Sequence, residues 1–162
     1  MKKIYLLSVI LLILNSLSSQ AQTKQYKVRT VAFYNVENLF DTINDPNKFD
    51  DDRTPEGKDH WTSANYHDHI HKIATTIAKI GRDVTGTAPD FVGLAEIENR
   101  MVVEDLAQSE ALKDYNYGIV HYDSPDARGI DVAFLYKKEL FTPTHTSKHF
   151  LDIKDPSTGK QR

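Results

Sequence analysis

The hydrophobic pattern of the chain predicts an alternation of strands and helices. Segments rich in β-branched, aromatic or continuous apolar residues predict four β-strands, at residues 28–35, 90–97, 117–122 and 131–136. The apolar residues 31–34 of the first segment are contiguous, so this strand is expected to be buried on both faces.

Apolar residues at helical spacing predict two helices. One runs through Ile70 to Ala78, with Thr62 or Ser63 as its expected N-terminal cap and Gly81 as its expected end. The other is expected over residues 102–112. The resulting order of strand, helix, strand, helix, strand, strand indicates an α/β or α+β protein. Beyond it, a further strand is expected to begin at 150–153, before a turn at 155–159.

Residues 1–21 are predicted to be a signal peptide. Lys2 and Lys3 precede the apolar run 4–14, and Ser19-Gln20-Ala21 offers a cleavage site. This run is shorter than the roughly 20 residues that a transmembrane helix needs, which disfavours an uncleaved anchor. We therefore expect an exported protein, periplasmic or extracellular, whose domain occupies 22–162 and has no stable membrane span.

Composition limits the chemistry that the chain can perform. The sequence has no Cys, which excludes disulfides and thiolate metal sites, so any metal must use oxygen or imidazole ligands. The formal net charge of −3 argues against a strongly basic nucleic-acid coat. An enzyme that holds phosphates with a few local groups and a metal stays compatible with this charge.

Polar residues follow the first two predicted strands. Asn35, Glu37 and Asn38 follow the first, and Glu96 and Glu98 follow the second. Ligands of α/β folds bind at the carboxyl ends of strands, and such oxygen donors suit Mg²⁺. Glu96 is the most informative of them, because it ends an apolar run where an ionised carboxylate needs a partner. The alternative is that the asparagines cap the loop backbone and that Glu98 is merely solvated.

Four strings together resemble the endonuclease/exonuclease/phosphatase superfamily, in its exported bacterial branch. They are FYNVENLFD (33–41), PEGKDHWTS (55–63), FVGLAEIEN (91–99) and SPDARGIDVAFLY (124–136). This superfamily includes DNase I, abasic-site endonucleases, sphingomyelinases and inositol polyphosphate phosphatases. The resemblance implies a four-layer αββα sandwich and cleavage of phosphate esters with Mg²⁺, or with Mn²⁺ in its place.

The resemblance also implies roles for individual residues. Asn35 and Glu96 would be catalytic and would hold the metal, with Glu37 as a further ligand. Asp131 would be catalytic, and Arg128 and Arg162 would contact the substrate phosphate. The substrate would be nucleic acid, a phospholipid or a small phosphoester, and no protein partner is evident.

Motifs of the family's second half have no match in this chain. The family supplies an Asp-Phe-Asn-type motif and a late Asp-His pair, and neither follows residue 136. The resemblance therefore implies the N-terminal half of a longer enzyme, which we expect to be inactive and poorly soluble by itself. The alternative is a non-catalytic fragment or a pseudo-enzyme that only binds.

Two other clusters suggest metals less strongly. His60, His67, His69 and His71 lie close in sequence, and His67 and His71 share a helix face that could bind Zn²⁺. No HExxH motif accompanies them, so a solvated helix start is expected. The acidic run 50–52 lacks the spacing of a Ca²⁺ loop and is expected to be solvated.

Overall fold

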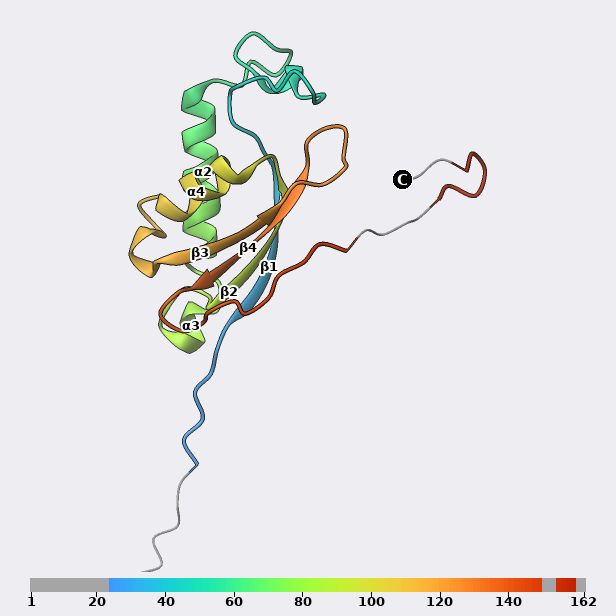
Figure 1. Cartoon of the computed structure of the whole chain (residues 1–162). Coiled ribbons are helices and arrows are strands. Elements are labelled where there is room, and N and C mark those ends of the chain that lie inside the picture. Colours follow the sequence, from blue (N-terminus) through green and yellow to red (C-terminus); the bar gives the residue numbers. More distant parts are fainter. Residues whose placement is uncertain (1–23, 150–153, 160–162) are drawn as a thin grey trace, which may run out of the picture.

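The computed structural model describes residues 24–149 and 154–159, which contain one four-stranded sheet with helices against it (Figure 1). The strand order is β1-β2-β4-β3. Strands β1 and β2 are parallel, whereas β2 with β4 and β4 with β3 are antiparallel. The strands are β1 (Val31–Leu39), β2 (Phe91–Ile97), β3 (Tyr117–Tyr122) and β4 (Asp131–Lys137).

Two helices, α2 (Ser63–Ile77) and α4 (Arg100–Gln108), lie on the same face of the sheet (Figure 1). Each begins at a side-chain cap, which satisfies an otherwise unpaired backbone N–H. Thr62 accepts a hydrogen bond from the N–H of Asn65, and Asn99 accepts one from the N–H of Val102. The shorter helices are α3 (Arg82–Thr85) and the 3₁₀ turns η1 (Asp51–Arg53) and η2 (Lys113–Tyr115).

The hydrophobic core lies between these helices and the sheet. Leu94 and Leu135 project from the sheet, and Ile77 and Leu106 project from the helices; all four side chains are fully buried. Burial of each such side chain contributes about 1.5–3 kcal/mol. The packing of the helices on the sheet therefore holds the strands in place relative to one another.

The opposite face of the sheet is largely uncovered in the described residues. Val31 is 71% exposed, Phe33 74% and Val132 61%. The expectation that the first strand is buried on both faces is therefore wrong for this part of the chain, because helices cover only one side. Residues 141–147 run along part of the uncovered face and line with it a cavity of about 630 Å³.

The predicted elements are present, with shifted ends. Strand β1 extends past the predicted end at Asn35 to Leu39, and α4 begins at Arg100, ahead of the predicted start. Helix α2 ends at Ile77, and Gly81 instead precedes α3, with a φ of 66° that suits glycine. The predicted signal peptide and the strand at 150–153 lie outside the described residues. Among those described, no helix is long and apolar enough to cross a membrane.

Candidate metal site at the strand ends

Both parallel strands are irregular at their carboxyl ends. The pairing of β1 with β2 shifts register between Asn35 and Leu39. The pairing of β2 with β4 shifts between Ala95 and Ile97. Such bulges re-aim side chains and are common beside active sites. The irregularities therefore mark the same edge of the sheet where the sequence places its candidate ligands.

Three residues at this edge have left-handed backbone conformations. The φ angles are 57° for Glu37, 64° for Asn38 and 66° for Glu96. A non-glycine residue in this region costs of order 1–3 kcal/mol, and such strain gathers at functional sites. For Glu96, this conformation turns the side chain out of the regular alternation of the strand.

Asn35 and Glu96 lie in direct contact. The Nδ2 of Asn35 donates a hydrogen bond of 2.8 Å to Oε1 of Glu96. The Oδ1 of Asn35 accepts a 2.8 Å hydrogen bond from the backbone N–H of Glu37. The structure thus brings together the side chains of Asn35 and Glu96 and the backbone of Glu37, the three residues that the resemblance implies as metal ligands. We call Asn35 and Glu96 the strand-end pair.

Arg128 lies in the loop between β3 and β4, close enough to Glu96 to interact with its charge. Its guanidinium binds Asp126 through two contacts, Nε to Oδ1 at 3.1 Å and Nη2 to Oδ2 at 2.8 Å. The Asp126 carboxylate raises the pKa of Arg128, and the Glu96 carboxylate adds to this rise. Arg162, the other residue predicted to contact phosphate, lies outside the described residues.

Asp131 lies at the start of β4, where it is 4% exposed. Its Oδ1 accepts a 2.6 Å hydrogen bond from the N–H of Ser124, and its Oδ2 lies 3.1 Å from Nε2 of His121. These contacts join the Asp131 side chain to Ser124 and His121 rather than to the strand-end pair. Its ligand atom lies within 4.8 Å of those of His121 and Asp123. We call these three residues the hairpin cluster.

Sequence reasoning did not single out His121 or Asp123. Their separation of two residues places both on one side of an extended strand, which is a usable signal for paired ligands. The third member, Asp131, is brought in only by the β3–β4 pairing, in which Tyr122 lies opposite Val132. That register cannot be read from the intervening loop.

A further group of carboxylates lies beside α4. Oε2 of Glu98 accepts a 2.6 Å hydrogen bond from the N–H of Asp41, and Asn99 donates to Asp41 Oδ2 at 3.0 Å. Burial raises the pKa of Glu98 to about 8, and the carboxylates of Asp41 and Asp50 add to the rise. Glu98 is thus not simply solvated.

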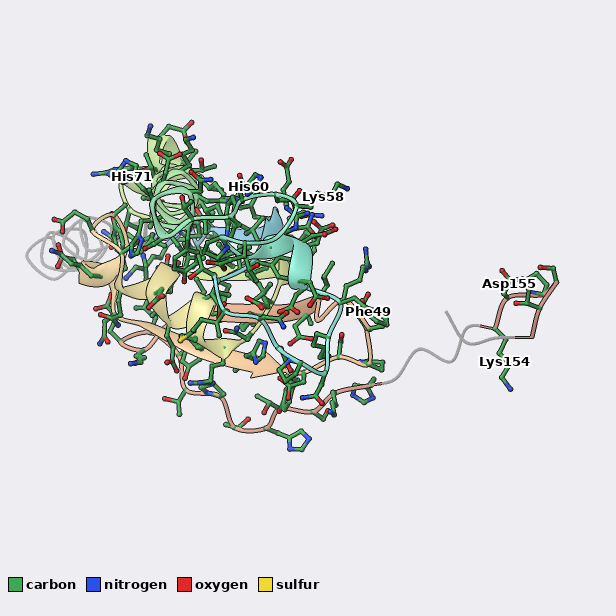
Figure 2. All side chains as sticks on the ribbon, turned by 90° about the horizontal axis from the view of Figure 1, so that it is seen from above. Phe49, Lys58, His60, His71, Lys154 and Asp155 are labelled. Atoms are coloured by element: carbon green, nitrogen blue, oxygen red, sulfur yellow. The ribbon has the colours of Figure 1, made fainter. Side chains whose placement is uncertain are left out.

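The acidic run differs from expectation at one residue. Asp50 is 2% exposed and accepts a 3.0 Å hydrogen bond from the N–H of Asp45. Asp51 and Asp52 are exposed, as expected of a solvated loop. The backbone N–H of Phe49, labelled in Figure 2, donates to the carbonyl of Ala127 at 2.9 Å, so this loop supports the loop that carries Arg128.

The histidines of α2 do not converge on one point. His69 is tied to the sheet, with its Nε2 3.1 Å from the carbonyl of Val36 and its ring edge-on to Trp61. His67 and His71 are exposed, and Figure 2 shows the labelled His60 apart from His71. Within the described residues, the histidine that belongs to a group of three possible ligands is His121.

The fold and this edge of the sheet define a mixed α/β protein with oxygen donors gathered at the ends of two parallel strands. The model of the endonuclease/exonuclease/phosphatase family matches residues 30–161, and the chain therefore belongs to this family. The four-stranded sheet with its helices is consistent with the family fold. The family acts on phosphoesters and is generally dependent on a divalent metal. No curated protein and no solved structure matches the chain.

Proposed function

We propose that this protein is an exported phosphodiesterase or nuclease that uses Mg²⁺. The observation that carries the proposal is the hydrogen bond between Asn35 and Glu96, which holds an amide and a carboxylate together at two irregular strand ends. Family membership makes phosphoester hydrolysis the reaction class. Nucleic acid, a phospholipid and a small phosphoester are all substrates that this reaction class includes.

The residues present fit the metal that the family implies. Asn35 Oδ1 and the carboxylates of Glu37 and Glu96 are hard oxygen donors, which Mg²⁺ prefers and Mn²⁺ accepts. These residues would hold the ion. When bound, it would polarise a phosphoryl oxygen and stabilise the charge that develops there. Asn35 orients the Glu96 carboxylate through its amide, so the ligand geometry is set before any ion arrives.

Arg128 is proposed to bind the substrate phosphate. Its two contacts to Asp126 are of the bidentate kind that a phosphate can replace. The side chain is exposed and its charge interacts with that of Glu96, so a phosphate could reach both. Arg162 is proposed for the same role, as the family resemblance implies.

We further propose that the working enzyme contains more protein than the described residues. The exposed apolar side chains Val31, Phe33 and Val132 support this, because a contiguous apolar sheet face is normally covered. The family's late Asp and His motifs would then supply the groups that activate water. A protein that only binds phosphoesters is the remaining alternative.

The experiment is hydrolysis of bis(p-nitrophenyl) phosphate by the protein as its native host produces it. We expect turnover that requires Mg²⁺ or Mn²⁺ and that Glu96→Gln, introduced in the gene, lowers by about 10²-fold or more. Glu104→Gln on the exposed side of α4 is the control and should leave the rate unchanged. Turnover that persists in EDTA, or that Glu96→Gln leaves intact, would exclude the proposal.

A further inference from the structure

We propose that the hairpin cluster, His121, Asp123 and Asp131, is a second metal site, separate from the strand-end pair, and that it takes a divalent transition ion such as Zn²⁺. This inference stands independently of the proposed phosphodiesterase activity. It rests on the arrangement of three side chains at the loop end of the β3–β4 hairpin.

The distances between the three ligand atoms are close to those around a bound zinc ion. They lie within 4.8 Å of one another, with His121 Nε2 and Asp131 Oδ2 at 3.1 Å. Zinc bonds of about 2.1 Å in tetrahedral geometry place ligand atoms about 3.4 Å apart. Asp123 is exposed, so its side chain has room to rotate and bring its carboxylate closer to the other two ligands.

His121 supplies an independent indication of a ligand. Its side chain is 4% exposed, yet its Nε2 makes no hydrogen bond within the described residues. The Asp131 oxygen is near enough for an ion pair but lies off the direction that a hydrogen bond needs. A buried polar atom without a partner is rare in folded proteins. A metal ion between the imidazole and the carboxylates would satisfy it.

The mixed set of one imidazole and two carboxylates favours a transition-metal ion such as Zn²⁺. Imidazole suits Zn²⁺ and its neighbours in the first transition row, whereas Mg²⁺ and Ca²⁺ favour oxygen donors alone. Asp131 is held in place because its other oxygen accepts the N–H of Ser124. Asp123 and Asp131 also line a cavity of about 370 Å³, which gives an ion access and leaves room for a water as fourth ligand.

The site would act on the loop that carries Arg128. His121 and Asp123 precede this loop and Asp131 follows it, so an ion would join its two ends. The loop is otherwise held by contacts such as Lys48 Nζ to the carbonyl of Asp126 at 3.2 Å. A bound ion would therefore fix the position of Arg128 relative to Glu96.

The test is calorimetric titration of Zn²⁺ into the full chain, with Mg²⁺ present in excess. The exposed His67 and His71 are replaced by Gln throughout, since this pair could bind zinc at the helix surface. We expect one Zn²⁺ per chain. Asp123→Asn should weaken binding by about tenfold or more, and His121→Gln should abolish it. Asp126→Asn, in the same loop, is the matched control and should change the affinity by less than about twofold.

Replacement of Zn²⁺ by Co²⁺ gives a second readout, because visible absorption bands report the ligand geometry. A tetrahedral spectrum that disappears in Asp123→Asn supports the site. If His121→Gln fails to fold, the exposed Asp123 still decides the question. Zinc affinity that Asp123→Asn leaves within about twofold would overturn the proposal, as would a failure of the chain with His67→Gln and His71→Gln to bind zinc.

Discussion

Asn35 and Glu96 are joined by a hydrogen bond of 2.8 Å although they stand 61 positions apart in the sequence. The parallel pairing of β1 with β2 brings them to the same edge of the sheet. Glu96 has a positive φ there, and both strands lose their regular register. The strain is thus localised at the residues to which we assign the metal.

Replacement of Asn35 by Ala removes a proposed ligand oxygen and the amide that orients Glu96. Loss of such an orienting partner typically weakens metal binding by 10–100-fold, so we expect a change of about that size. Electron paramagnetic resonance of Mn²⁺ measures this, with Asp123→Asn in the background to weaken the hairpin cluster. Asn65→Ala on the exposed face of α2 is the control. Equal Mn²⁺ affinity in Asn35→Ala and in the control would show that Asn35 neither binds the metal nor orients Glu96.

Stability should depend on pH through Glu98. Its pKa is raised from 4.5 to about 8, chiefly by burial. Below the lower value it is protonated in both states, and its contribution to stability is complete. As the pH rises, the unfolded state releases the proton first, so the free energy of unfolding falls between about pH 4.5 and pH 8.

Urea denaturation in EDTA across this pH range measures the effect. Glu98→Gln stays neutral, so the free energy of unfolding of this variant should fall less steeply with pH. Glu104→Gln, on the exposed side of α4, should leave the slope unchanged. The same slope in Glu98→Gln as in the unmodified chain would mean that another group titrates.

Lys137 anchors the far end of β4 through a buried ion pair. Its Nζ lies 3.2 Å from Oδ1 of Asp90, and both side chains are almost fully buried. It also donates to Thr87 Oγ1 at 2.9 Å and to the carbonyl of Ala88 at 2.7 Å. Lys137→Met leaves Arg29, whose Nη1 lies 3.3 Å from Oδ2, as the remaining ion-pair partner of the buried Asp90 carboxylate. The variant also loses both hydrogen bonds of Lys137, and we expect a loss of about 3–5 kcal/mol in the free energy of unfolding.

The neighbouring Lys138 is exposed and provides the matched control. Lys138→Met should change stability by less than about 0.5 kcal/mol in the same urea titration. Comparable losses in the two variants would show that the buried ion pair does not stabilise the sheet.

The sequence predicts the elements well because periodicity and caps are local properties. Thr62 caps α2 as expected, and Asn35 and Glu96 stand out in the sequence because each polar side chain follows an apolar run. Burial of the first strand on both faces is not found in the described residues, because the length of an apolar run does not tell how many layers cover it. Phe33 is an example, because it lies in the apolar run and yet is exposed on the face that the helices do not cover.

Other features depend on contacts between distant segments. Burial of Asp50 follows from the path of a long loop, and the hairpin cluster follows from the β3–β4 register. The raised pKa of Glu98 needs the approach of both Asp41 and Asp50. Spacing along the chain carries no information on these approaches, so the sequence alone could not predict them.

The most direct test of the central claim, that the strand-end pair binds a divalent metal, is Mn²⁺ binding to the full chain followed by electron paramagnetic resonance. With Asp123→Asn in the background, we predict a bound ion that Mg²⁺ displaces. Glu96→Gln should weaken this binding by about tenfold or more, and Glu104→Gln should leave it unchanged. The account would be contradicted if the chain with Asn35 and Glu96 intact bound no Mn²⁺, or if Glu96→Gln bound Mn²⁺ equally strongly.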